Sequence, residues 1–174
     1  MASRKSTVCL MAGYAGAQVI PVDIGIACET IPSGKKIDDM DGILHKKISH
    51  GTKNFLKEHA MTDKQCIKAI ETGKEIVKMC SEKGINIIAT GEMGIGNTTT
   101  SAALAAILLD EKPENVTGYG AGLTNEGLKN KTETVRKACE MYSGYKDDTL
   151  KLLSCIGGLD IAGLAGVFIG GAEY

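Results

Sequence analysis

The sequence predicts an α/β fold, in which a parallel sheet is flanked by helices in a Rossmann-like layered arrangement. Two observations predict it. Apolar runs at residues 17–26 and 85–89 have the composition of buried strands, and the segment between them contains an amphipathic helix at residues 62–84. A strand, a crossover helix and a second strand form a right-handed βαβ unit with a parallel sheet. Since 174 residues is about the length of one domain, we expect a single core domain over residues 1–174.

The first part of the chain contains one expected strand between two less regular segments. Residues 3–15 have a weak helical pattern. Residues 17–26, AQVIPVDIGI, form the expected strand, which ends near Asp23 and Gly25. Residues 28–41 are polar and contain proline and glycine, so they are predicted to form a loop.

The helix at residues 62–84 has clear signals at both ends. Thr62 is a good N-terminal cap, and Gly84 lies where a left-handed C-terminal cap is expected. Small and apolar residues recur between them at intervals of three and four: Cys66, Ile67, Ala69, Ile70, Gly73, Ile76, Val77 and Cys80. The strand at residues 85–89 follows this helix directly.

The second half of the chain is predicted to be mainly helical. A helix is expected from residue 97 to about residue 110, followed by a glycine-rich turn at residues 118–123. A charged amphipathic helix is expected at residues 125–142, with Leu128, Val135, Ala138 and Cys139 on one face.

The C-terminal segment, residues 147–174, contains an apolar run that is too short to span a bilayer. Gly163, Gly166 and Gly170 recur there at helical intervals. This spacing predicts a close approach of backbones, which we expect to be the packing of a helix on the sheet.

Composition excludes several classes of partner. Lys and Arg number 20 against 21 Asp and Glu, a net charge of -1, so the chain has no basic field that would attract nucleic acid or an anionic membrane surface.

The six cysteines form no C-x-x-C pair, and several lie in apolar helical patterns. We therefore expect reduced core thiols in a cytoplasmic protein, without a metal site.

The segment GEMGIGNTTTSAAL, residues 91–104, carries the clearest functional signal. It has the G-x-x-x-x-G spacing of a P-loop, but Asn97 replaces the lysine that a nucleoside-triphosphate site requires. A dinucleotide fingerprint would need glycine at Thr99. A glycine loop between a strand and a helix N-terminus favours an anion, so a monophosphate or a carboxylate fits best. The alternative is a plain tight turn with Asn97 and the following threonines acting only as caps.

The same segment resembles the hallmark of the nicotinate-nucleotide:dimethylbenzimidazole phosphoribosyltransferases, the CobT family. The resemblance continues, in family order, through VDIGIA, GTKNFLKEHAMT, the GYGAGL turn with GLKNKTETV, and GGLDIAGLAG. It implies transfer of the phosphoribosyl group of nicotinate mononucleotide to 5,6-dimethylbenzimidazole, which gives α-ribazole 5'-phosphate and nicotinate. The resemblance implies no metal and no other cofactor.

The resemblance also assigns roles to particular residues. Glu92 and Gly94 fall on nucleotide-site positions, with Glu92 in a supporting catalytic role near the ribose, and Lys131 matches a lysine that approaches the substrate. The alternative for Lys131 is a solvated helix face. With the loop and turn glycines, the candidate substrate-binding residues are Gly91, Gly94, Gly96, Asn97, Thr98, Thr99, Gly118, Gly120, Gly122 and Lys131.

The chain departs from the family pattern in length and at two positions. Family members are about twice as long, so a partial family fold is expected, and the glutamate that serves as general base is expected to fall after residue 174. A binding module without catalysis is therefore the alternative function. Asp160 occupies a position that is usually Glu, and Tyr119 occupies a position that is frequently Arg.

The parallel sheet that the sequence predicts is narrow, so the edges of its strands are left uncovered. We therefore expect the chain to associate as a homodimer.

Overall fold

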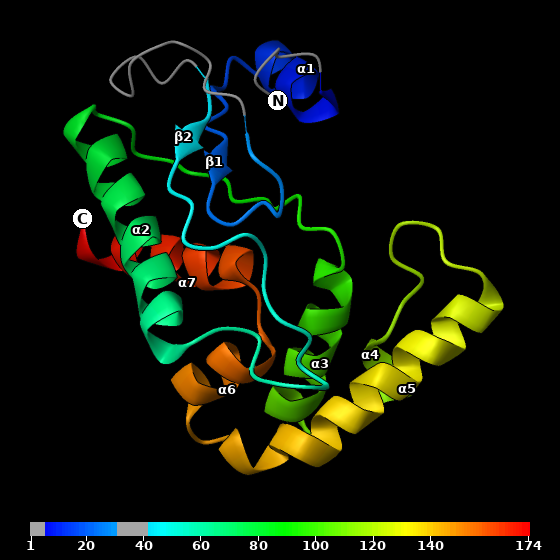
Figure 1. The fold of residues 1–174 in the computed structure, drawn as a ribbon. Helices are drawn as coiled ribbons and strands as arrows, with labels where there is room; N and C mark the ends of the chain where they lie inside the picture. Colours follow the sequence, from blue (N-terminus) through cyan, green and yellow to red (C-terminus); the bar gives the residue numbers. More distant parts are fainter. Residues whose placement is uncertain (1–5, 31–41) are drawn as a thin grey trace. The chain divides into compact units, whose positions relative to one another are not determined.

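The computed structural model describes residues 6–30 and 42–174 and shows a helix-rich α/β chain with a small parallel sheet (Figure 1). Its contacts divide it into two compact units, Met1–Gly51 and Thr52–Tyr174. The expected single domain over residues 1–174 stays a prediction.

The first unit contains helix α1 (Thr7–Tyr14) and the parallel strands β1 (Val22–Asp23) and β2 (Leu44–His45), with Val22 opposite Leu44. The strand predicted at residues 17–26 is therefore too long. Backbone bonds join residues 21–25 to residues 44–51 in sequence, and in the described chain no segment pairs with residues 17–20. A strand exists only where a neighbour completes its ladder, and apolar composition alone does not supply one.

Asp23 is fully buried at the end of β1 and holds the following loop in place. Its carboxylate accepts hydrogen bonds from the Ile26 amide at 2.9 Å and the Thr30 hydroxyl at 2.7 Å. Lys47 lies 3.3 Å from the same carboxylate and donates to the Ile26 and Cys28 carbonyls. Burial alone raises the pKa of Asp23, but the Thr30 and Ile26 hydrogen bonds and the Lys47 ammonium together hold it below its ordinary value.

This arrangement predicts a loss of stability in acid. A depressed native pKa stabilises the fold above the unfolded value of about 4, and the stabilisation is lost as pH falls from that value through the native pKa. Exchange protection of the Ile26 amide, corrected for the intrinsic rate at each pH, should decline over that range. Asp23→Asn should show weak protection already at neutral pH, whereas Asp147→Asn, at an exposed site, should not. Protection that stays constant through the acid range would contradict the assignment.

The second unit begins with helix α2 (Asp63–Glu82), which confirms the helix predicted from residue 62. Thr62 and Gln65 form a reciprocal capping box at its start: the Gln65 amide donates to the Thr62 hydroxyl, and the Thr62 amide donates to the Gln65 side chain. Gly84 has the predicted left-handed conformation after the helix, with φ of +73°.

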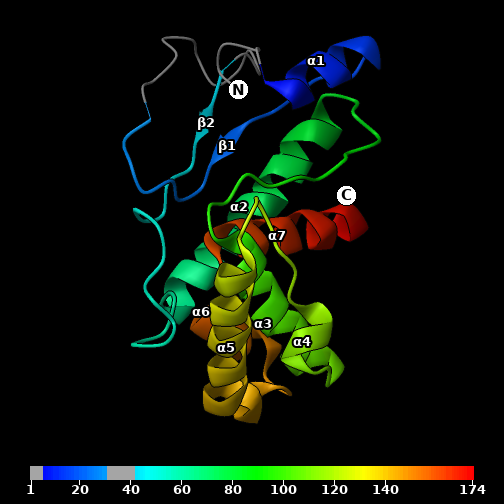
Figure 2. The ribbon, with the colours of Figure 1, turned by 90° about the vertical axis from the view of Figure 1, so that its right-hand side faces the viewer.

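Helix α7 (Leu159–Glu173) packs directly on α2, as Figure 2 also shows. The predicted glycines lie in this contact. A Cβ atom added to Gly73 would lie 2.1 Å from the carbonyl oxygen of Gly163, and one added to Gly166 would lie 1.9 Å from that of Ile70. The predicted close approach of backbones is confirmed, but its expected partner is wrong. These glycines pack against a helix and not against a sheet.

The strand predicted at residues 85–89 does not form. The Ile85 amide bonds back to the Cys80 carbonyl of α2 at 3.0 Å, and the segment then runs without a ladder partner in the described part of the chain. The side chain of Ile87 is 88% exposed and that of Ile88 is 40% exposed. The expected βαβ unit is therefore wrong in its pairing, because the parallel neighbour of β1 is β2.

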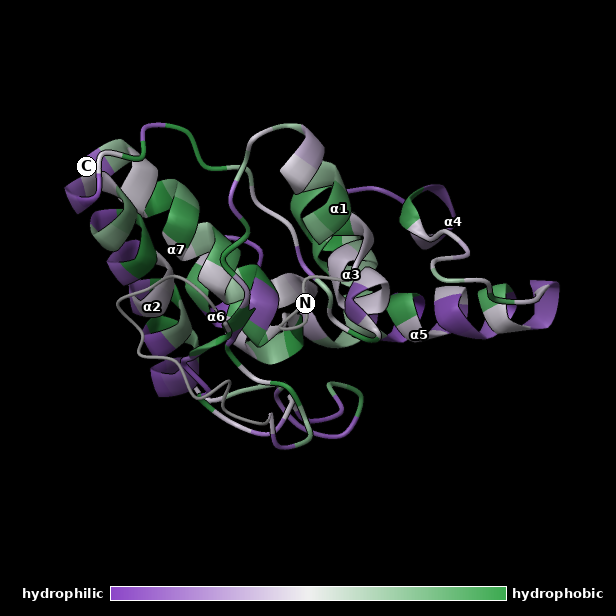
Figure 3. Cartoon of the chain, turned by 90° about the horizontal axis from the view of Figure 1, so that it is seen from above, coloured by the Kyte–Doolittle hydropathy of each residue, from purple (hydrophilic) through white to green (hydrophobic). Residues whose placement is uncertain are grey.

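Helices α3 (Asn97–Leu109) and α5 (Asn125–Tyr142) confirm the two helices predicted in this half. The short helices α4 (Pro113–Val116) and α6 (Thr149–Ile156) pack beside them. Their common core is apolar and includes Ala103, Val135, Ala138, Leu152, Cys155 and Ile156. Figure 3 shows the alternating polar and apolar stretches along α5.

Three of the cysteines, Cys66, Cys80 and Cys155, are buried thiols, as predicted. Burial raises the pKa of each, for Cys66 to about 11. The prediction of core thiols is wrong for the other three, because Cys9 and Cys139 are half-buried and Cys28 is exposed. Among the helices that the structure describes, none has both the length and the apolar character needed to cross a membrane.

Candidate functional site

The start of α3 has no side-chain cap, a feature that it shares with the start of α7. Helices α2 and α5 are capped by the side chains of Thr62 and Thr124, whereas α3 has Gly96 at its N-cap and no side-chain cap. Gly96 has φ of +83°, a left-handed conformation that glycine adopts without strain. The Asn97 and Thr99 amides donate to the Gly94 and Gly96 carbonyls, and the partial positive charge of the helix start favours an anion beside them.

Lys131 comes from α5 and reaches the start of α3. Its side chain is only 7% exposed, and Nζ donates to the Thr98 hydroxyl at 2.9 Å and to the Gly118 carbonyl at 2.8 Å. Burial lowers the pKa of Lys131. Since an ammonium has three N–H donors, these two bonds leave one for a ligand. The solvated helix face that was the alternative for Lys131 is wrong.

The glycine turn at residues 118–122 lies against the same helix start. Gly120 has φ of +59°, and a Cβ atom there would lie 2.9 Å from the Thr98 hydroxyl and 3.5 Å from Lys131 Nζ. Gly122 also has a positive φ, of +95°. The turn therefore requires glycine for its conformation at both positions and for close contact with α3 at Gly120.

Two carboxylates lie beside the loop. The Glu92 side chain accepts a hydrogen bond from the Gly94 amide at 2.5 Å and is exposed. Asp160, in the first turn of α7, accepts a hydrogen bond from the side-chain amide of Asn97, also at 2.5 Å. Asn97 is 9% exposed. Its side chain is thus bonded within the fold, while its backbone remains part of the helix start.

We call residues 91–99, residues 118–122 and Lys131 the anion cradle. The structure brings Gly94, Thr98, Gly118, Gly120 and Lys131 together with the start of α3. A Cβ atom added to Gly91, Gly96 or Gly122 would meet no atom within 4 Å, so contact with the fold does not explain glycine at these positions. Thr99 is half-buried, and its amide bonds to the Gly96 carbonyl.

Sequence reasoning assigned no side-chain role to Asp160, although it contacts the cradle through Asn97. The available signal was the Gly157–Gly158 pair followed by an acidic residue, which is typical of a helix start. Nothing in the spacing indicated that this helix start would meet the loop 63 residues earlier.

Comparison with known proteins finds relatives that match nearly the whole chain. A family model described as "Phosphoribosyltransferase" matches residues 1–174. The nicotinate-nucleotide–dimethylbenzimidazole phosphoribosyltransferase of Acetivibrio thermocellus is 47% identical over 163 residues, which are 92% of this chain and 44% of that protein. Its counterpart in Clostridium acetobutylicum is 44% identical over 165 residues, 94% of this chain and 47% of that protein.

A solved structure is also similar. The crystal structure of CobT from Thermus thermophilus matches with a TM-score of 0.87 and 31% identity, over 99% of this chain and 49% of that one. The chain therefore spans about half the length of the relatives that it matches.

Proposed function

The chain belongs to the phosphoribosyltransferase family whose model matches all of its residues, and on this premise we propose that it acts on nicotinate mononucleotide and 5,6-dimethylbenzimidazole. The products would be α-ribazole 5'-phosphate and nicotinate. The substrate pair is the one named for its relatives. We expect the setting to be cytoplasmic, which the buried thiols support.

One observation carries the proposal: the uncapped start of α3 lies beside the buried ammonium of Lys131. The positive end of a helix without a side-chain cap and a lysine with one remaining N–H form a site for a single phosphate group. The cradle lacks a lysine at position 97, where a P-loop directs one at the β and γ phosphates. A mononucleotide suits this charge better than a triphosphate does.

The transfer itself requires few groups from the protein. A nitrogen of dimethylbenzimidazole attacks the anomeric carbon, the bond to nicotinate breaks, and its electron pair leaves with nicotinate. The azole loses its N–H proton to a base. In this scheme the cradle holds the phosphate and so positions the anomeric carbon for attack, and positioning is a large part of such catalysis.

A second candidate is a module that binds the nucleotide without turnover. It is favoured because both carboxylates beside the cradle are already bonded within the fold, Glu92 to the Gly94 amide and Asp160 to Asn97. These bonds hold both carboxylates against the fold, whereas a general base must reach the azole nitrogen.

Product analysis separates the two candidates. The chain is incubated with both substrates, and α-ribazole phosphate and nicotinate are measured, with Glu92→Gln in parallel. Formation of both products supports the transferase, and their loss in Glu92→Gln would make Glu92 the proton acceptor. Binding of the mononucleotide without product supports the binding module. Absence of binding would contradict both.

We also propose that the chain associates as a homodimer. The segment at residues 85–95 carries exposed apolar side chains at Ile87, Met93 and Ile95, and such surface favours association. Sedimentation equilibrium at micromolar concentration should give about twice the monomer mass, and a clean monomer would contradict this.

A further inference from the structure

Asp160 contacts the anion cradle from α7, a helix that contributes no residue to it. Its Oδ2 atom accepts a hydrogen bond from Asn97 Nδ2 at 2.5 Å. Asn97 is the first residue of α3, and Asp160 lies in the first turn of α7. One side-chain hydrogen bond therefore joins the starts of the two helices.

The Asn97 side chain is fixed at both ends. While Nδ2 donates to Asp160, Oδ1 accepts a hydrogen bond from the Ser101 hydroxyl one turn further along α3, at 3.1 Å. The side chain is also nearly buried. It cannot rotate without losing a partly buried hydrogen bond, so the position of the first turn of α3 depends on Asp160.

Two glycines make room for the Asp160 carboxylate. A Cβ atom added to Gly94, in the loop, would lie 2.4 Å from Oδ2, and one added to Gly158 would lie 2.2 Å from Oδ1. The carboxylate thus lies against the backbone of Gly94 on one side and of Gly158 on the other. Its position is tightly defined by the loop that it holds.

We infer that Asp160 is the positioning residue of the cradle. It holds residues 94–97 and the first turn of α3 in the geometry that receives the phosphate, and it acts through Asn97 without touching the ligand. The inference rests on the proposed function, since it assumes that the cradle binds a phosphate. A preorganised site binds more tightly because less ordering is needed on binding.

The sign of the effect distinguishes positioning from simple charge. A carboxylate near an anion site repels the anion, so removal of Asp160 by charge alone would strengthen phosphate binding. Positioning predicts the opposite for Asp160→Ala. Asp160→Asn removes the charge but keeps an oxygen that can accept the Asn97 hydrogen bond, so it should rescue the affinity.

Calorimetric titration of nicotinate mononucleotide tests the inference. We expect Asp160→Ala to raise Kd by about tenfold, the effect of losing one hydrogen bond, and Asp160→Asn to stay near the unsubstituted value. In an Asn97→Ala background, Asp160→Ala should add little, because the two residues act as one unit. An effect in that background as large as in the unsubstituted chain, or a tighter Kd for Asp160→Ala, would overturn the inference.

Hydrogen exchange without ligand provides a second arm that does not depend on the proposed function. Asp160→Ala should lower the protection of the Asn97 and Thr99 amides, which bond to the Gly94 and Gly96 carbonyls. The matched control is Asp63→Ala: Asp63 is also a first-turn acid, bonded to Ser154 and Lys151, but at the start of α2. Unchanged protection in Asp160→Ala, or an equal loss in both variants, would overturn the inference even if no nucleotide binds.

Discussion

Gly166→Ala is expected to lower the free energy of unfolding by about 3 kcal/mol, the upper part of the range for overpacking a closely packed site. A Cβ atom at this position would lie 1.9 Å from the carbonyl oxygen of Ile70 and 2.7 Å from its carbon. Both atoms belong to the backbone of α2, so no side-chain rotation relieves the contact. The two helices would have to move apart along their length.

Urea unfolding followed by circular dichroism measures this effect, and α7 contains its own control. Gly171 lies in the same helix, and a Cβ atom there would meet no atom within 4 Å. Gly171→Ala should therefore be neutral or stabilise by roughly 0.5 kcal/mol, because alanine has the higher helix propensity. Similar unfolding free energies for the two variants would contradict the α2–α7 packing.

Lys131→Ala is expected to weaken binding of the mononucleotide by roughly 1.5 to 3 kcal/mol, the range for a hydrogen bond to a charged group. Lys131 donates to Thr98 and Gly118 from a nearly buried position. Its loss therefore removes a cation and also loosens the two segments that it joins. Lys131→Met, which keeps the length of the side chain, should show a similar loss if the charge is what matters.

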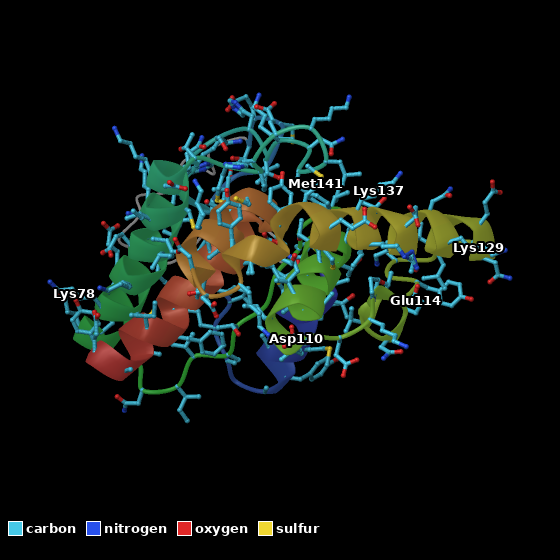
Figure 4. The ribbon with its side chains drawn as sticks, turned by 90° about the horizontal axis from the view of Figure 1, so that it is seen from below. Lys78, Asp110, Glu114, Lys129, Lys137 and Met141 are labelled. Atoms are coloured by element: carbon cyan, nitrogen blue, oxygen red, sulfur yellow. The ribbon has the colours of Figure 1, made fainter. Side chains whose placement is uncertain are left out.

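Lys129→Ala is the control, since Lys129 is exposed on the same helix (Figure 4), and its effect should be small. Titrations with both variants measure the difference, and equal effects would place Lys131 outside the site. The pH dependence gives a further check. Because burial lowers the pKa of Lys131, the affinity should begin to fall at a less alkaline pH than an ordinary lysine would give.

The helices of the second unit could be predicted closely from the sequence, because their signals are local. Thr62 and Gly84 mark the limits of α2, and the helix predicted at residues 125–142 is α5. Periodic apolar residues and caps act over a few positions, so a sequence pattern is enough to detect them. The glycine loop before α3 could be recognised for the same reason, whereas the assignment of Lys131 came from the family resemblance.

What could not be predicted depends on partners distant in the sequence. The apolar run at residues 85–89 has strand composition but no ladder partner in the described chain, while β2, in a segment rich in Lys and His, pairs with β1. The glycines of α7 indicated close packing without indicating that α2 would be the partner. The bond between Asp160 and Asn97 was missed for the same reason.

The central claim is that the cradle recognises the single phosphate of a mononucleotide. The most direct measurement is a calorimetric titration of the unsubstituted chain with nicotinate mononucleotide and, separately, with the same nucleoside lacking its phosphate. We predict that the mononucleotide binds at least about tenfold more tightly, since the attraction of the helix start and the charge-assisted hydrogen bond from Lys131 would be lost with the phosphate. Equal affinity for the two compounds would contradict the claim.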